Sequence, residues 1–305
     1  EISACLVGSE MCIRDRDKLQ GMSEMLQKMG ITVNAYLPAA DLQTIKKAPR
    51  AALNIVRRKK WALAMEQRFG TPFLHVADMQ EWHGIEGISD LYRQIGKMLG
   101  CEDAVERVLQ AEYERVAARY QELRTEFAKY KFCLIAHGIA YLPDALRVYQ
   151  QDYGLPIEKI CIIMNPSYQA ETGLDDAMMQ RFKDRIELAK AEYGCDAEIL
   201  LEPSEKALRE AAQSCDFVIC NGHPRYASLD VPVLYNLFDR SVWSYQGFVD
   251  IMEEVWQMLQ QPQRTGSSLL LSKLAYDPVF YPMREADKDS KAARELYSRV
   301  WRQRK

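Results

Sequence analysis

The chain has 305 residues, of which 48% are hydrophobic and 27% are charged, a composition typical of a soluble globular protein with room for two domains. The net charge of −3 lacks the basic excess of nucleic-acid-binding proteins, and no apolar run approaches the ~20 residues that span a bilayer. The eight cysteines form no CxxC pair and suggest no disulfide framework, so we expect a reducing, cytoplasmic compartment and neither a nucleic-acid nor a membrane partner.

Residues 1–16 are interpreted separately from the rest of the chain. From Cys5 to Arg16 they read CLVGSEMCIRDR, which resembles a translated sequencing-adapter peptide seen at the ends of proteins predicted from assembled environmental DNA. As a non-native leader they would carry no information on fold or function, and the chain would be an N-terminally truncated fragment. The alternative is a short native strand from Ala4 to Val7, ended by Gly8.

Residues 17–100 alternate between helix and strand patterns and form the first predicted domain. Apolar residues at helical spacing between Leu19 and Met29 predict a helix that Gly30 ends. The elements predicted after it are a strand over 31–37, a helix over 48–69 with a basic middle, a strand over 72–76 and a helix over 88–99.

Residues 101–129 predict one long charged helix that connects the first domain to a second, over residues 130–262. The second domain is predicted to have strands over 131–136, 159–164, 197–201, 217–220 and 231–234, with helices over 143–153, 174–193 and 204–213 and a last helix from Phe248 to Leu259. Residues 263–305 are a C-terminal tail. Alternating strands and helices imply right-handed βαβ units, so we predict an α/β fold with two parallel sheets flanked by helices.

Polar residues follow several of these strands and define the candidate site. The carboxyl ends of parallel strands are where ligands bind in open α/β sheets. The residues expected to face a cofactor or substrate are Asn165, Ser167, Cys220, His223, Arg225, Asp239, Arg240, Tyr245 and Gln246.

Four of these candidates, the cysteine, the two arginines and the histidine, have a structural alternative. Cys220 is alternatively a buried thiol, and the two arginines alternatively pair with nearby aspartates. His137, like His223, follows a strand and could simply cap its end. His75 is expected in the core or at an interface, whereas His83 lies in a predicted loop and could face a ligand or another subunit.

The usual cofactor and catalytic motifs are missing from the sequence. It contains neither GxGxxG nor GxxxxGK[ST], so neither a dinucleotide site nor a P-loop is supported. It also lacks HExxH, CxxC and GxSxG, which leaves no sequence support for a zinc site or a hydrolase triad.

Several segments, in order, resemble one known family. Tyr245-Gln246-Gly247-Phe248 is similar to the Tyr-x-Gly motif that opens a helix near the cofactor in the nitrogenase component 1 family. The other similar segments are Ala51–Val56, which matches a helical segment of that family, Phe69–Pro72, Trp82–Ile88, Asp216–Ile219 and Val231–Val233. The resemblance runs from about Asp17 to Gln261.

This resemblance implies an architecture and partners. Subunits of the family have three Rossmann-like domains, pair with a homologous subunit and receive electrons from an ATP-dependent iron–sulfur reductase protein. The chain would hold the second and third domains, as two Rossmann-like domains joined by a long helix. The missing first domain would carry the cysteines of an iron–sulfur cluster, so this fragment is expected to encode no metal ligands.

Two departures from the family pattern narrow the expected function. The cysteine that follows the Ala51–Val56 segment in molybdenum–iron-cofactor subunits is replaced around Arg57 and Arg58, and the histidine of the Tyr-x-Gly motif is replaced by Gln246. Neither residue type can substitute for thiolate or imidazole as a soft-metal ligand. We therefore expect a nitrogenase-like oxidoreductase subunit of unknown substrate that is not a molybdenum–iron-cofactor nitrogen fixer. The alternatives are a non-catalytic scaffold or carrier for a metal cluster or tetrapyrrole, and a bilobal small-ligand-binding protein.

Overall fold

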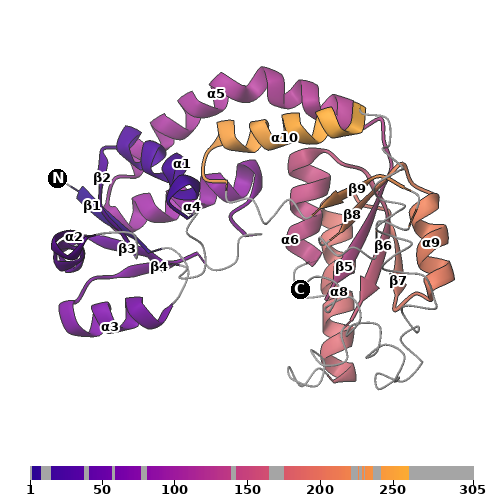
Figure 1. Cartoon of the computed structure of the whole chain (residues 1–305), viewed down its shortest axis with the longest axis horizontal. Coiled ribbons are helices and arrows are strands. Elements are labelled where there is room, and N and C mark those ends of the chain that lie inside the picture. Colours follow the sequence, from indigo (N-terminus) through magenta and orange to yellow (C-terminus); the bar gives the residue numbers. More distant parts are fainter. Residues whose placement is uncertain are drawn as a thin grey trace, which may run out of the picture.

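Two parallel β-sheets form the framework of the protein, one in each half of the chain (Figure 1). The computed structural model describes residues 2–7, 15–37, 41–56, 59–76, 81–138, 142–164, 175–220, 226, 229, 231–235 and 242–260. The strand order is β2-β1-β3-β4 in the first sheet and β7-β6-β5-β8-β9 in the second. All neighbouring strands pair in parallel, which confirms the predicted α/β fold.

Strands and helices alternate along both halves of the chain. The strands are β1 Ile2–Val7, β2 Ile31–Leu37, β3 Leu53–Val56, β4 Phe73–His75, β5 Phe132–His137, β6 Ile157–Ile163, β7 Glu198–Leu201, β8 Phe217–Cys220 and β9 Val233–Tyr235. The helices are α1 Asp15–Lys28, α2 Leu42–Lys47, the 3₁₀ turn η1 Ala48–Arg50, α3 Lys59–Phe69, α4 Gly84–Leu99, α5 Glu102–Phe127, α6 Leu142–Leu146, the π-helical segment η2 Arg147–Tyr153, α8 Asp176–Glu192, α9 Glu205–Gln213 and α10 Tyr245–Gln260.

The second sheet is the middle of three layers. Its central strands β5 and β8 are buried and apolar on both faces, because alternate residues point to opposite sides and helices cover both sides. On one side, residues such as Leu134 and Ile160 join a core with α6 and α8. On the other, Cys133 and Cys161 pack with residues of α9. Figure 1 shows α9 on the opposite side of this sheet from α6 and α8.

The first sheet is covered in the same way. Leu53 and Ile55 of β3 point to the core shared with α1 and α4, whereas Val56 points to a small cluster with Ala48 and Ala62. That small cluster lies under α2, η1 and α3. Thus β3 is buried on both faces and paired on both edges, with β1 and with β4.

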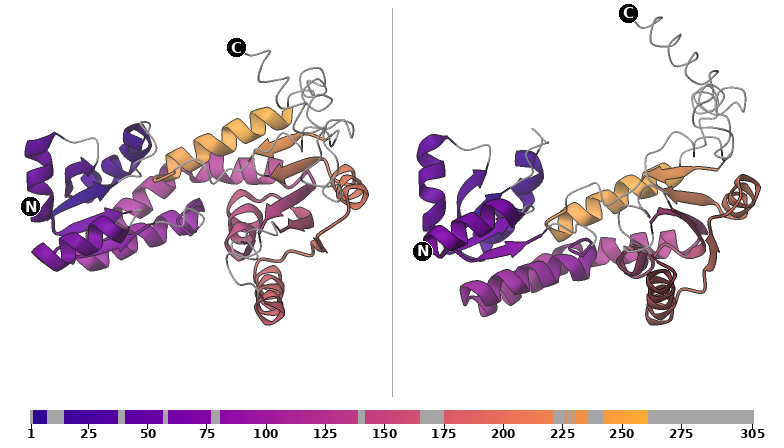
Figure 2. Two further views of the ribbon diagram at one scale, coloured as in Figure 1. Left: turned by 60° about the horizontal axis from the view of Figure 1, so that its bottom comes forward. Right: turned by 90° about the horizontal axis from the view of Figure 1, so that it is seen from below.

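Helices α5 and α10 join the two halves. Both helices run between the two sheets and lie side by side in every view (Figures 1 and 2). Arg119 of α5 binds the carboxylate of Glu253 of α10 through two nitrogens, with Nη2–Oε2 at 2.7 Å, and its guanidinium lies 5.4 Å from the ring centre of Trp256. One continuous hydrophobic core runs from α1 and α4 through α5 and α10 to β5 and α6, so the halves share a core.

The predicted apolar stripe of the last helix is confirmed. All five residues of this stripe on α10 lie in the core that the two halves share: Phe248, Ile251, Met252, Val255 and Leu259. The predicted connecting helix is likewise present as α5, which begins and ends within two residues of the predicted bounds.

The prediction of one helix over residues 48–69 is wrong, and so is the helical interpretation of Ala51–Val56. The segment contains η1, then strand β3, then α3. Leu53, Ile55 and Val56 are apolar residues that suit a buried strand, and β3 forms because β1 and β4 supply hydrogen-bonding partners on both sides. Such partners are distant in sequence, so local helical patterning did not show them.

The expectation that residues 1–16 take no part in the fold also differs from the structure. Residues 2–7 form β1, which lies between β2 and β3 in the first sheet, and Asp15 begins α1. This corresponds to the alternative of a short strand, extended by two residues toward the N-terminus. The non-native origin of the segment, like the domain boundaries, stays a prediction.

Candidate functional site

The carboxyl ends of the second sheet's strands lie at one edge, because all five strands run in the same direction. At this edge His137 ends β5, Ile163 ends β6 and Cys220 ends β8. His137 Nε2 forms a hydrogen bond with the hydroxyl of Tyr226, and the two rings lie 5.6 Å apart in an edge-to-face arrangement. Tyr226 is fully buried and His137 is half-buried, so this pair closes the end of β5.

A second polar contact at the same edge joins β6 and β7. The backbone N–H of Met164 donates to the carboxylate of Glu202, directly after the two strands end. Glu202 has a φ of +47°, a left-handed conformation that is uncommon for a residue with a side chain. The strand ends are therefore held by polar contacts.

Six of the nine sequence-predicted site residues lie outside the described residues: Asn165, Ser167, His223, Arg225, Asp239 and Arg240. The other three, Cys220, Tyr245 and Gln246, are described, and the structure does not bring them together. Cys220 lies in the core beneath α9, whereas the other two open α10 against the first half of the chain.

The thiol of Cys220 is buried in apolar surroundings. Its exposed fraction is 2%, and it packs in the cluster that contains Cys133, Cys161 and Cys215. Burial raises the pKa of Cys220 to about 12, so the side chain is a neutral thiol at physiological pH. Among the described residues, it does not face an open cleft.

The Tyr-x-Gly motif does begin a helix, as the resemblance implies, and its tyrosine anchors that helix. The Tyr245 hydroxyl lies 2.7 Å from Ser89 Oγ of α4, and its ring packs edge-on to Tyr113 of α5. Gln246 instead is exposed, and its Nε2 donates to Asp250 Oδ1 at 2.8 Å along the helix surface. The two neighbours therefore have different environments, one structural and one solvent-facing.

A buried polar cluster that the sequence did not predict lies where the two halves meet. Arg147 Nη1 binds Asp152 Oδ2 at 3.0 Å, and both side chains are largely buried, with exposed fractions of 11% and 3%. Asp152 Oδ1 accepts hydrogen bonds from the backbone N–H groups of Ile85 and Glu86, in the first turn of α4. Residues 147 and 152 are about 65 positions from α4, so no local sequence signal pairs them.

His83 belongs to this cluster and faces neither a ligand nor another subunit among the described residues. Its exposed fraction is 1%, its Nε2 lies 2.9 Å from the Tyr153 hydroxyl, and its ring packs on Phe248. Burial, and secondarily the positive charge of Arg147, lower the pKa of His83 to about 3. The imidazole is therefore neutral. His83 is a buried core residue and not the accessible loop histidine that the sequence suggested.

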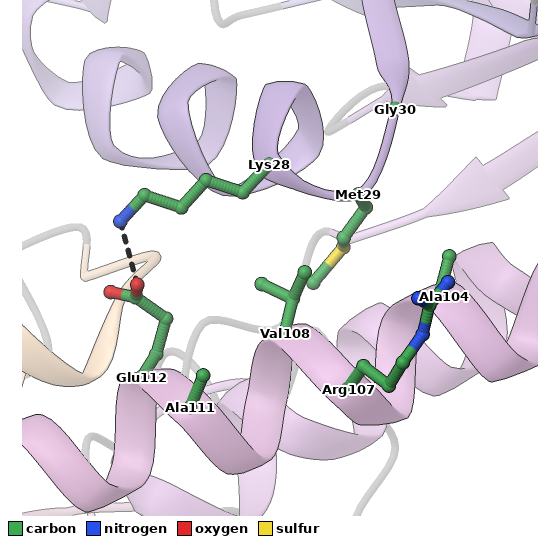
Figure 3. Close-up of a pocket in the computed structure, with 8 residues that line it drawn as sticks. All are labelled: Lys28, Met29, Gly30, Ala104, Arg107, Val108, Ala111 and Glu112. Atoms are coloured by element: carbon green, nitrogen blue, oxygen red, sulfur yellow. Dashed lines mark hydrogen bonds and ion pairs between the residues drawn. The ribbon is translucent and has the colours of Figure 1, made fainter.

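A surface cavity of about 500 Å³ lies between the end of α1 and the first half of α5 (Figure 3). Lys28 reaches across it to Glu112 at 2.8 Å, and Met29 and Val108 face each other inside it. Because Lys28 and Met29 directly precede β2, the cavity is at the amino end of that strand, away from the carboxyl ends where a ligand is expected. It does not coincide with any sequence-predicted site residue.

The described residues do not provide a metal site. No group of three or more His, Cys, Asp or Glu side chains in these ranges is placed to hold a metal ion. These described residues therefore contain no set of three or more side chains that could by itself ligate the cluster implied by the family resemblance. Within the same residues, no helix is both long and apolar enough to cross a bilayer.

Comparison with solved structures shows the same fold in nitrogenase chains. Nitrogenase Cp1 matches at pH 6.5 and at pH 5, each with a TM-score of 0.55, at 14% and 15% sequence identity, over 86% and 91% of this chain. The chain spans 59% of the length of each nitrogenase chain. Unliganded FhuD2 from Staphylococcus aureus has a TM-score of 0.44 at 14% identity, covering 84% of this chain and 91% of its own, which is too low to support an argument.

The sequence comparisons identify the family. A search of curated proteins finds no match. The family described as nitrogenase component 1 type oxidoreductase matches residues 6–260, which is most of the 305 residues. The chain therefore belongs to the nitrogenase component 1 type oxidoreductase family.

Proposed function

We propose that this chain is part of a nitrogenase-like oxidoreductase subunit, which takes electrons from an ATP-dependent iron–sulfur reductase protein and passes them to a substrate of unknown identity, without the molybdenum–iron cofactor of nitrogen fixation. The family match over residues 6–260 carries this proposal. The proposal also includes two protein partners, which are a homologous subunit and the reductase protein. It further includes a cytoplasmic location.

The environment of Gln246 supports the exclusion of a molybdenum–iron cofactor. Its amide is neutral, exposed and bonded to Asp250, and an amide is a poor ligand for a soft metal. Among the cysteines whose side chains are described, five are buried and Cys101 is half-buried before α5, and none of them belongs to a group of three or more potential metal ligands. Under the proposal, the ligands of an iron–sulfur cluster lie outside the described residues, and we assign no electron-transfer step to any described side chain.

The test is anaerobic purification of the longest form of the subunit that its gene encodes, compared with the 305-residue chain. We expect stoichiometric iron and cluster absorption in the longer form only. That absorption should decrease when a chemically reduced iron–sulfur reductase protein, which supplies the electrons, is added together with MgATP. Iron in the longer form without ATP-dependent reduction would instead favour a scaffold or carrier. No iron in either form would refute the redox proposal, and tight iron binding by the 305-residue chain would contradict the placement of the ligands.

A further inference from the structure

The helical layer on one face of the first sheet is strongly basic. It consists of α2, η1 and α3, and it lies on the opposite side of that sheet from α1 and α4 (Figure 1). Residues 41–69 contain eight lysines and arginines but only two acidic residues, whereas the whole chain has a net charge of −3. We call α2, η1 and α3 the basic layer, and its six described cations are all exposed: Lys46, Lys47, Arg50, Lys59, Lys60 and Arg68.

The charge of the basic layer is not balanced by ion pairs within the described ranges. The ion pairs found there use other cations, such as Arg93, Arg119 and Lys159, and none of these six. Lys59 and Lys60 also open α3, whose first turn has no acidic residue, so both lie at the positive end of the helix dipole. An external anionic group would therefore relieve repulsion that the described part of the chain leaves in place.

Four of the cations gather at the end of the basic layer where β3 and β4 begin. Thr71 Oγ1 donates to the carbonyl oxygen of Pro49 at 3.0 Å, which ties η1 to the turn after α3. Arg50 and Arg68 therefore lie on neighbouring segments, and the two lysines in the last turn of α2 directly precede η1. The guanidinium of Arg68 lies 5.5 Å from the ring centre of Phe69, so a cation and an exposed aromatic ring stand together at this end.

Exposed apolar side chains accompany the cations. Leu42 of α2, with Leu63 and Phe69 of α3, are three of the seven large hydrophobic residues that are exposed in the described chain. Leu42 is 75% exposed, since α2 buries none of its residues. A surface that covers this layer would remove apolar area from water and give the unpaired cations partners, and both changes favour a specific protein contact.

We propose that the basic layer is a docking surface for a partner protein whose own surface carries acidic and apolar side chains, with Arg50, Arg68 and Phe69 near the centre of the contact. Arginine and aromatic residues are the types that carry much of the binding energy at protein interfaces. Charge complementarity selects the partner, because the layer attracts acidic surfaces and repels basic ones. The inference rests on charge and exposure alone, so it goes beyond the proposed electron transfer and does not depend on it.

Other anionic partners match the basic layer less well. The phosphate backbone of a nucleic-acid duplex pairs with cations but offers nothing apolar to Leu42, Leu63 and Phe69. A membrane surface binds helices with a continuous apolar face, whereas the exposed surface of α3 mixes Lys60 and Arg68 with Leu63. A second copy of this chain would have to supply acidic groups, and many of those described already bind cations or backbone N–H groups of their own chain.

Fluorescence anisotropy of labelled peptides, titrated with the 305-residue chain at low salt, tests this surface. One probe is a polyglutamate peptide, and the other has the same charge with leucines interspersed among its glutamates. The layer variant carries Lys46→Glu, Arg50→Glu and Arg68→Glu. We expect it to bind both peptides at least about tenfold more weakly than the wild-type chain, and we expect added salt to weaken wild-type binding.

A matched control variant carries the same change of charge on α8 and α9, as Arg181→Glu, Arg185→Glu and Lys206→Glu. These three side chains are exposed, and this variant should bind much more tightly than the layer variant. Phe69→Ser tests the apolar part of the contact: it should weaken binding of the leucine-containing peptide about fivefold and leave polyglutamate binding close to wild type. If the glutamate variants do not fold, as judged by circular dichroism, glutamine at the same positions should change binding in the same direction.

Four outcomes would overturn the proposal. Equal binding by the layer and control variants would mean that the peptides respond to net charge and not to this surface. Failure of the wild-type chain to bind either peptide would also refute it. Tighter binding of a random-sequence DNA duplex or of phosphatidylserine vesicles, lost in the layer variant, would assign the layer to that partner instead. Salt-dependent self-association in sedimentation velocity, lost in the layer variant, would assign it to a second copy of the chain.

Discussion

Replacing Phe248 by alanine should destabilise both halves of the protein at once. The ring is fully buried, and its centre lies 4.6 Å from that of Tyr153, 5.6 Å from that of His83 and 6.3 Å from that of Tyr120. These partners belong to η2, to the turn before α4 and to α5, so the ring fills the junction of three elements. Truncating a buried phenylalanine costs about 3–5 kcal/mol, from lost burial and from the cavity left behind.

Urea unfolding followed by tryptophan fluorescence and by far-ultraviolet circular dichroism measures this loss. Phe248→Leu should recover more than half of it, because most of the buried volume is restored. Met258→Ala is the matched control on the same helix, since Met258 is 41% exposed, and it should stay within about 0.5 kcal/mol of wild type. The reasoning is refuted if Phe248→Ala behaves like Met258→Ala, or if only one of the two probes shifts.

Three further predictions concern individual side chains. A double-mutant cycle on Arg119 and Glu253 should give a coupling of about 0.5–1 kcal/mol that shrinks in 1 M salt, because both side chains are about one third exposed; a coupling unaffected by salt would argue against this pair. His83 stabilises the fold above its unfolded pKa of 6.5, and this contribution is lost as pH falls toward its folded pKa of about 3. Measured by urea unfolding, acidification to pH 5 should therefore lower the free energy of unfolding of the wild-type protein by about 2 kcal/mol more than that of a His83→Gln variant. The same pH dependence of unfolding in both proteins would count against a buried neutral imidazole. Cys220 should resist iodoacetamide at pH 8 in the folded chain but react in urea, as mass spectrometry can show; fast labelling of the folded chain would mean that the thiol is accessible.

Elements that carry a strong local pattern were predictable from the sequence. Strand β2 matches its predicted range of 31–37, β8 matches 217–220, and the apolar stripe of α10 lies in the core. Short elements without such a pattern were not. The sequence suggested a helix where β3 lies, because β3 has only four residues and its partners β1 and β4 lie elsewhere in the chain. The six-residue α2 has no buried residue, so it left no apolar pattern to predict it from.

The candidate site shows the same division. The loop histidine His137 was correctly placed at a strand end, but its partner Tyr226 was not predicted. Tyr245 was predicted to open a helix and does so, yet it anchors that helix on Ser89 instead of lining a cleft among the described residues. Sequence motifs mark where a residue lies along an element, whereas the direction of its side chain depends on what packs beside that element.

The sequence by itself determined the α/β class, the family and the absence of soft-metal ligands at the Tyr-x-Gly motif, because these depend on periodicity and residue identity. Only the tertiary structure decided the strand order, the shared core and the cluster of His83, Arg147 and Asp152. Asp152 and its partners in α4 are more than 60 residues apart, and a carboxyl group in a helix usually indicates a solvated surface. Its burial against the first turn of α4 follows from how the two halves pack, which no local pattern encodes.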